Sequence, residues 1–236
     1  MITTVLFDLD GTLIHMDQDD FIKNYFQQIA MYFAKLGYDP VRFTKSMQIG
    51  VVAMMTNNGE KLNQEVFWKS FCEAYGEDLS KETEKFERFY ETDFDAVKQY
   101  CGTKPNAKEL LEKLREMGLR LVLASNSVYP PIAYEKRMGW GGLTPEPFEL
   151  LTSYENMHYC KPSLGYFKEV TEKLGVTPEE CLMVGNDMSD DMSARHLGMK
   201  VFLLTDYLIN PKNEDTSNLP QGNFDDLIKY IEENKS

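Results

Sequence analysis

The stretch "VLFDLDGTL", Val5 to Leu13, begins as an apolar strand and then carries two carboxylates, Asp8 and Asp10. A glycine and a threonine, Gly11 and Thr12, follow at once. Because side chains alternate along a strand, aspartates two residues apart lie on the same side of the chain. The pattern therefore predicts a buried strand that ends in a polar turn with two acids side by side.

Beyond about residue 105 the chain alternates between helical and strand patterns. Short apolar runs follow one another as "LRLVLASNS" (119–127), "FELLTSY" (148–154), "CLMVGND" (181–187) and "KVFLLTD" (200–206). Helical patterns at 105–117 and 162–175 lie between them, and a closing helix is expected at 224–233 after a polar loop. This alternation predicts an α/β fold, with a parallel sheet and helices on both of its faces.

Residues 17–100 have a different character, because their apolar residues recur only at helical spacing. Aromatic stripes run along 21–37, 66–76 and 85–100, and they indicate helices packed around a core of their own. The stretch Met47 to Gly59 is rich in small residues, and we expect a loop there that faces the site. The predicted organisation is a core domain of residues 1–16 and 101–236 with an inserted helical cap domain of residues 17–100.

Composition excludes several classes of protein. The 236 residues carry a formal net charge of −13, which argues against nucleic acid and anionic membranes as partners. The N-terminus lacks the pattern of a signal peptide, and no apolar run reaches the roughly 18 residues of a membrane span. A cytoplasmic protein is expected. The four cysteines form no CxxC pair and the three histidines have no ligand spacing, so we expect free thiols and no zinc site.

Three of the predicted core strands end in polar residues. These ends are Asp8–Asp10, Ser125–Asn126 and Asn186–Asp187, and Lys161 stands just before a predicted helix. In an open parallel sheet, ligands bind outside the carboxyl ends of the strands, so these groups should meet in one crevice. Several carboxylates held together need a cation, and a hard, oxygen-preferring ion such as Mg²⁺ fits best.

Four segments resemble, in order and spacing, the four motifs of the haloacid dehalogenase-like (HAD) hydrolase superfamily. They are "DLDGT" at Asp8–Thr12, the strand ending at Ser125–Asn126, Lys161–Pro162, and "GNDMSDD" at Gly185–Asp191. The helical insert between the first two resembles the C1-type cap of subfamily I. The resemblance implies a Rossmann-like core with this cap, and it covers essentially the whole chain.

The resemblance also implies roles for the acids and the lysine. Asp8 would attack phosphorus and become an aspartyl phosphate. Asp10 would protonate the leaving oxygen and then deprotonate the hydrolytic water, while its main-chain carbonyl contacts Mg²⁺. Lys161 would offset the charge on Asp8 and on the phosphate. Gly11 would allow a sharp turn and bring backbone N–H groups close to the phosphate.

Further residues would hold the phosphoryl oxygens or complete the metal site. The expected phosphate-binding residues are Thr12, Ser125, Asn126 and Lys161, with bracing of the loop as an alternative role for Thr12. The expected metal ligands are Asp8, Asp10 and Asp187.

Asn186 competes with Asp187 for the third ligand position, because it directly follows Gly185 where many relatives have aspartate. We choose Asp187 because it carries the full charge. Asp191 would then pair with Lys161, and Asp190 is interpreted as a solvated acid at a helix start. A second departure is His15 and Met16, where many relatives carry an acid.

The acid at position 10 favours phosphate esters as substrates. In the dehalogenase branch of the superfamily this acid is absent, because a halide leaves without a proton. The first hypothesis is a Mg²⁺-dependent phosphatase acting on a small phosphorylated metabolite. A sugar-phosphate mutase of the same superfamily is the alternative, and a non-catalytic binding protein on the same fold is a third.

Overall fold

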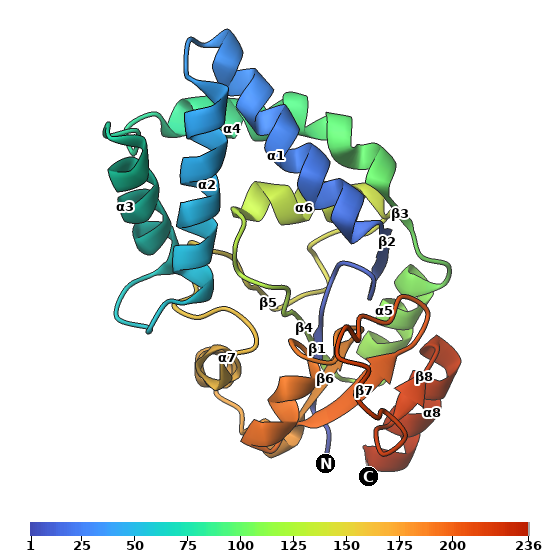
Figure 1. The fold of residues 1–236 in the computed structure, drawn as a ribbon. Coiled ribbons are helices and arrows are strands. Elements are labelled where there is room, and N and C mark those ends of the chain that lie inside the picture. Colours follow the sequence, from blue (N-terminus) through green and yellow to red (C-terminus); the bar gives the residue numbers. More distant parts are fainter. Residues whose placement is uncertain (236) are drawn as a thin grey trace.

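A six-stranded parallel sheet forms the centre of the protein, whose computed structural model describes residues 1–235 (Figure 1). All neighbouring strands in it run parallel, which confirms the α/β prediction. In spatial order the strands are β5 (Leu150–Leu151), β4 (Arg120–Leu123), β1 (Thr4–Phe7), β6 (Cys181–Gly185), β7 (Lys200–Leu204) and β8 (Gln221–Gly222). The strand of the opening motif, β1, therefore lies between β4 and β6.

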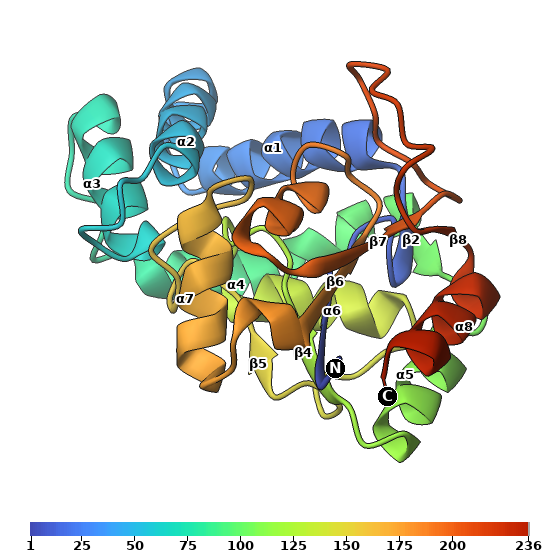
Figure 2. The ribbon, with the colours of Figure 1, turned by 90° about the horizontal axis from the view of Figure 1, so that it is seen from below.

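Helices cover both faces of this sheet. Successive strand residues point to opposite faces, so both faces carry apolar side chains that must be buried. Val5 and Phe7 of β1 pack toward α5 (Ala107–Glu116), α6 (Pro131–Trp140) and α8 (Phe224–Asn234). Leu6, between them, packs toward the opposite face. Figure 2 shows α7 on one side of the sheet and α5 with α8 on the other. The second face is covered by α7 (Leu164–Leu174) and by the short 3-10 helix η3 (Met192–Leu197), and a further turn, η2 (Pro178–Glu180), precedes β6.

A helical insert lies between two short strands, β2 (Ile14–Met16) and β3 (Cys101–Thr103), which pair antiparallel. Figure 1 shows its helices gathered at the end of the sheet far from the N-terminus. The insert comprises α1 (Gln18–Lys35), α2 (Pro40–Met55), α3 (Asn63–Tyr75), α4 (Thr83–Glu91) and the 3-10 helix η1 (Asp93–Tyr100). This is the arrangement of a C1-type cap, and it stands over the carboxyl ends of the strands.

The aromatic stripes predicted from the sequence form the core of this insert. Phe21, Tyr25 and Phe33 of α1 are buried, and so are Phe71 of α3 and Phe89 of α4. The insert is also tied to the sheet region by main-chain hydrogen bonds at the start of α3. The N–H of Asn63 donates to the carbonyl of Met157 at 2.9 Å. The insert thus has its own apolar core and a fixed attachment to the rest of the chain.

The prediction of a loop at Met47 to Gly59 is wrong, because α2 continues through this stretch as far as Met55. Asp39 caps the helix by accepting from the N–H of Arg42, and Pro40 occupies its first turn. A Cβ on Gly50 would lie 2.7 Å from Cδ2 of Phe67, so this glycine allows close packing between α2 and α3. Other elements that were not predicted include α6 and β8, the second of which lies in the expected loop before residue 224.

No helix within residues 1–235 is both long and apolar enough to cross a membrane. The four cysteines are unpaired, as the sequence predicted, and Cys160 and Cys181 are buried.

Candidate active site

A polar cavity of about 90 Å³ lies where the carboxyl ends of β1, β4 and β6 meet. Backbone hydrogen bonds join the ends of these strands. The N–H of Asp8 donates to the carbonyl of Val184, and the N–H of Ala124 donates to the carbonyl of Phe7. The sequence-predicted residues that line the cavity are Asp8, Asp10, Ser125, Asn126, Lys161 and Asp187. Further lining comes from Gln18, Asn186, Asp190, Asp191 and Ile209. The sheet therefore brings together all predicted site residues except Thr12.

Asp8, Lys161 and Asp191 form a buried row of alternating charge. The Lys161 Nζ donates to Asp8 Oδ1 at 2.9 Å and to Asp191 Oδ1 at 2.6 Å. Only 1% of the Lys161 side chain is exposed. Burial works against its charge, but the carboxylates of Asp191 and Asp8 outweigh burial and raise the pKa of Lys161 well above its usual range. The lysine is therefore a fixed cation beside Asp8, and its expected contact with Asp191 is present.

Asp191 also organises the loop that follows β6. Its second oxygen, Oδ2, accepts from the backbone N–H groups of Asn186 and Asp187 at 3.1 and 3.0 Å. A Cβ on Gly185 would lie 2.1 Å from this same oxygen, so only glycine fits there. One carboxylate thus positions both the lysine and the loop that carries Asp187.

Asp10 has a buried partner that the sequence did not predict. Arg137 of α6, itself 1% exposed, donates through Nη1 to Asp10 Oδ2. Burial raises the pKa of Asp10 to about 6, even though Arg137 acts in the opposite direction. Within the described chain, Oδ1 of Asp10 and Nη2 of Arg137 are buried without a hydrogen-bond partner. Asp10 is thus a carboxyl group that can hold a proton close to neutral pH.

The sharp turn expected after Asp10 is present at Gly11. Gly11 has a φ of +78°, a conformation that favours glycine, and a Cβ there would lie 2.4 Å from Nδ2 of Asn186. Its N–H donates to the carbonyl of Ile14 at 2.9 Å. The turn itself uses this donor, so the N–H of Gly11 is not free to bind phosphate.

Thr12 is also placed differently from the prediction of a phosphate-binding residue. It is fully buried outside the cavity lining, and its hydroxyl donates to Oδ1 of Asn186 at 3.1 Å. The other side of that amide, Nδ2, donates to the carbonyl of Tyr207 at 2.6 Å. The geometry favours bracing of the loop as the role of Thr12, since its hydroxyl contacts Asn186 and not the cavity.

Two acids near the end of β6 face the polar cavity. Asp187 uses Oδ1 to accept from the N–H groups of Ser189 and Asp190 at 2.7 and 2.8 Å. Asp190, which we expected to be solvated, lines the cavity and accepts from Asn126 Nδ2 at 3.3 Å. Burial raises the pKa of Asp190, and the negative charges of Asp187 and Asp8 add to the effect. The expectation of a solvated Asp190 is therefore wrong.

The donor set of this cavity fits Mg²⁺. Burial raises the pKa of Asp190 first, and the nearby carboxylates of Asp187 and Asp8 add to this effect, so a bound cation would offset the negative charge gathered here. Within residues 1–235, no three His, Cys, Asp or Glu side chains form a closed cage for a metal. Mg²⁺ does not require such a cage, because it usually binds one or two carboxylates and keeps water or substrate oxygens as its other ligands.

Ser125 and Asn126 are fixed at the end of β4. The carbonyl of Ser125 accepts from the hydroxyls of Thr152 at 2.7 Å and Tyr166 at 2.8 Å. Oδ1 of Asn126 accepts from the N–H of Lys161 at 3.2 Å. The strand end that carries these two side chains is therefore rigid.

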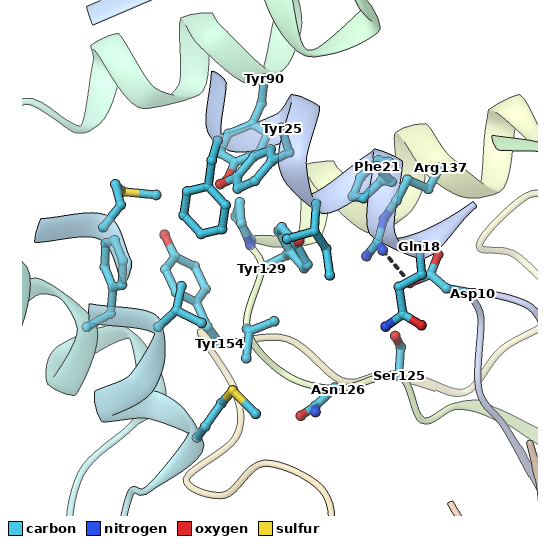
Figure 3. A pocket seen from close by; sticks show the side chains of 18 of the residues that line it. Asp10, Gln18, Phe21, Tyr25, Tyr90, Ser125, Asn126, Tyr129, Arg137 and Tyr154 are labelled. Carbon is cyan, nitrogen blue, oxygen red and sulfur yellow. Dashed lines mark hydrogen bonds and ion pairs between the residues drawn. The ribbon is translucent and has the colours of Figure 1, made fainter. Parts of the chain in front are cut away.

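A second cavity, which we call the cap cavity, adjoins the polar one and measures about 260 Å³. It lies between the insert and the sheet region, and it shares Asp10, Gln18, Ser125, Asn126 and Asp190 with the polar cavity. Figure 3 shows Asp10, Gln18 and Ser125 at one end of it, and Tyr25, Tyr90 and Tyr154 at the other. Any molecule bound at Asp8 can therefore extend past Asp10 into the cap cavity.

The chain is similar to proteins whose family is known. The family model of haloacid dehalogenase-like hydrolases matches residues 2–198. The chain is 24% identical to a phosphoglycolate phosphatase of Psychrobacter arcticus, over 96% of this chain and 94% of that protein. It is 24% identical to a glyceraldehyde 3-phosphate phosphatase of Methanothermobacter thermautotrophicus, over 91% and 90%.

A solved structure shares the fold across its whole length. The HAD phosphatase from Thermococcus onnurineus superposes with a TM-score of 0.57 at 22% sequence identity, covering 98% of both chains.

Proposed function

Because this chain belongs to the haloacid dehalogenase-like hydrolase family, we propose that it is a Mg²⁺-dependent phosphatase that hydrolyses a small phosphorylated metabolite. The observation that carries the proposal is the contrast between two aspartates of one cavity. Asp8 is paired with the cation of Lys161, whereas burial raises the pKa of Asp10 to about 6. Nucleophilic attack followed by protonation of a leaving oxygen needs this combination.

The first half of the reaction transfers the phosphoryl group to Asp8. The oxygen of Asp8 that does not accept from Lys161 forms the new bond to phosphorus, and the ester P–O bond breaks. The departing alcohol oxygen takes a proton from Asp10. Lys161 offsets the negative charge that gathers on Asp8 and on the phosphoryl oxygens.

The second half of the reaction restores the enzyme. Asp10, now ionised, removes a proton from a water molecule, which attacks phosphorus and releases inorganic phosphate from Asp8. Asp10 is protonated again and ready for the next ester. Arg137 holds the carboxyl of Asp10 in place during both transfers.

Mg²⁺ would be held by the carboxylates of Asp8 and Asp187 and by the main-chain carbonyl of Asp10. When bound, it supplies positive charge that lets an anionic nucleophile approach an anionic phosphoryl group. The preference for Asp187 over Asn186 is supported by the contacts of Asn186, whose amide is engaged by Thr12 and Tyr207.

Ser125, Asn126 and Lys161 would bind the phosphoryl oxygens. All three line the polar cavity. The Thr152 hydroxyl donates to the carbonyl of Ser125, and the N–H of Lys161 donates to Oδ1 of Asn126, so both residues are held at the strand end. We further propose that the chain is organised as a core domain of residues 1–16 and 101–236 and a cap domain of residues 17–100. The cap would close over the substrate and contribute the contacts that select it.

Phosphoester substrates are supported by the phosphatases to which the chain is similar. The test is hydrolysis of p-nitrophenyl phosphate by the purified protein with Mg²⁺. Activity should disappear with EDTA and return when Mg²⁺ is added in excess. Asp8→Asn should abolish turnover while circular dichroism stays native, because the change removes the nucleophile and keeps the side-chain shape. Near-native turnover by this variant would refute the proposal.

A further inference from the structure

The cap cavity has walls that suit a carbon skeleton. α1 contributes Phe21 and Tyr25, α3 contributes Phe67 and Trp68, and the segment after β4 contributes Tyr129. Aromatic faces of this kind bind flat or branched apolar groups with large buried area. We infer that the cap cavity receives the alcohol part of the substrate, and that the preferred substrates are phosphate monoesters with an uncharged, apolar or aromatic alcohol. This inference rests on the proposed function and adds the substrate class.

Two of the tyrosine hydroxyls on this wall are satisfied by each other. The hydroxyls of Tyr25 and Tyr90 lie 2.8 Å apart and bond to each other. The Tyr129 ring lies against the guanidinium of Arg137, with 4.7 Å between the Arg137 Cζ and the ring centre. The hydroxyls of Tyr25 and Tyr90 are therefore already paired, and a ligand gains little by hydrogen bonding to them.

Charge also argues against a second anionic group on the substrate. Among the described residues that line the cap cavity, Arg137 is the one basic side chain, and it is already paired with Asp10. The acids Asp10 and Asp190 stand at its polar end. A carboxylate or second phosphate placed in this cavity would be desolvated without a free cation to pair with it, which disfavours its binding.

The size of the cavity sets the scale of the alcohol. A buried apolar cavity of about 150 Å³ holds one benzene molecule. The cap cavity measures about 260 Å³, so it has room for a body larger than a single six-membered ring.

The first experiment compares esters whose alcohols have similar acidity, so that binding of the carbon skeleton decides the difference. Ethyl, 2-phenylethyl and 2-(1-naphthyl)ethyl phosphate form such a series, and phosphoglycolate is the charged comparison. We expect kcat/KM to rise on the order of 10²-fold from ethyl to 2-phenylethyl phosphate. Phosphoglycolate should fall at or below ethyl phosphate. Equal values across the series, or a preference for phosphoglycolate, would overturn the inference.

Two substitutions on adjacent residues of α2 connect this selectivity to the cap cavity. Val51 lines the cavity, whereas its neighbour Val52 is 59% exposed and does not. Val51→Trp should fill part of the space and reduce the preference for 2-(1-naphthyl)ethyl over ethyl phosphate at least about tenfold. Val52→Trp should keep that preference. If Val51→Trp does not fold, Val51→Leu should give a smaller drop in the same direction. An unchanged preference in the folded Val51 variant would refute the assignment.

A binding measurement separates this inference from the proposed function. 3-Phenylpropylphosphonate and propylphosphonate mimic the 2-phenylethyl and ethyl esters, but their P–C bonds resist hydrolysis. Calorimetry in Mg²⁺ should show tighter binding of the phenyl compound, and the fluorescence of Trp68 should change, whereas Trp68→Phe should lose that change. If this preference holds while no ester is hydrolysed, the proposed function fails and only the preference of the cap cavity for apolar groups stands. If esters are hydrolysed without preference, the substrate class fails alone.

Discussion

The guanidinium of Arg137 donates a hydrogen bond to the carboxylate of Asp10, although 127 positions separate the two residues in the chain. Three aromatic rings surround the guanidinium, those of Tyr129, Tyr134 and Phe21, and its Nε donates to the carbonyl of Ala133. The arginine is therefore held rigidly, and it fixes one oxygen of Asp10. We expect it to act as a positioning residue for the proton transfers of Asp10.

The pH dependence of turnover should reveal this pairing. Asp10 must be protonated to release an alcohol, so kcat/KM for an alkyl phosphate should fall as the pH rises above about 6, the pKa to which burial raises Asp10. A positive neighbour lowers a carboxyl pKa, so Arg137→Met should raise the pKa of Asp10 and move the descending limb to higher pH. Arg137→Lys keeps the charge and should leave the limb near its wild-type position. A limb that stays in place in Arg137→Met would contradict the pairing.

Loss of Asp10 should depend on the leaving group. Asp10→Ala should lower turnover of alkyl phosphates on the order of 10²–10⁴-fold, the usual contribution of a positioned acid. An aryl phosphate should lose less, because its leaving oxygen needs less protonation. The ratio of the two losses, measured at saturating Mg²⁺, is the readout. Equal losses would mean that Asp10 only shapes the loop.

The metal requirement should distinguish Asp187 from Asn186. Asp187→Ala should raise the Mg²⁺ concentration that gives half-maximal activity, and excess Mg²⁺ should restore part of the rate. Asn186→Ala should change this requirement less and lower stability more, because its amide bonds to Thr12 and Tyr207. Calorimetric titration with Mg²⁺ gives the same comparison without turnover. The reverse ranking would assign the ligand to Asn186.

The buried partner of Lys161 should matter for folding. Asp191→Ala removes a carboxylate that contacts Lys161 at 2.6 Å and accepts from two backbone N–H groups. Breaking such a buried pair should lower the free energy of unfolding by about 3 kcal/mol, the low end of the usual range because Asp8 still faces the lysine. Urea denaturation measures this. The exposed Asp19→Ala is the control, with a change within about 0.5 kcal/mol.

Thr12 should behave as a structural residue. Thr12→Val removes the donor to the buried Oδ1 of Asn186, and we expect a loss of about 1–3 kcal/mol in unfolding free energy. Ser125→Ala should instead raise the KM for phosphate esters with a smaller change in stability, because Ser125 lines the polar cavity. A larger KM effect in Thr12→Val than in Ser125→Ala would return Thr12 to the phosphate site.

The sequence by itself determined the parallel sheet and the place of the site. Apolar runs such as 181–187 end in polar residues, and the carboxyl ends of parallel strands lie along one edge. Those two facts were sufficient to bring Asp8, Ser125 and Asp187 together. They depend on local periodicity and on one general property of parallel sheets, so distant contacts were not needed.

Local sequence pattern was insufficient to predict the helix α2. Met47 to Gly59 looked like a loop because of Gly50 and its small neighbours, yet α2 runs to Met55. The glycine is there because Phe67 packs against it from another helix. Glycine is required at position 50 because α3 packs closely there. The residues of α2 alone do not reveal that neighbour.

Tertiary structure alone decided which atoms meet in the site. It placed Arg137 on Asp10, turned Thr12 away from the cavity toward Asn186, and brought Asp190 into the cavity. Periodicity predicts which face of an element is buried. It does not predict the side chain that lies opposite, because that depends on how α6, the loop after β6 and the sheet pack across large separations in the chain.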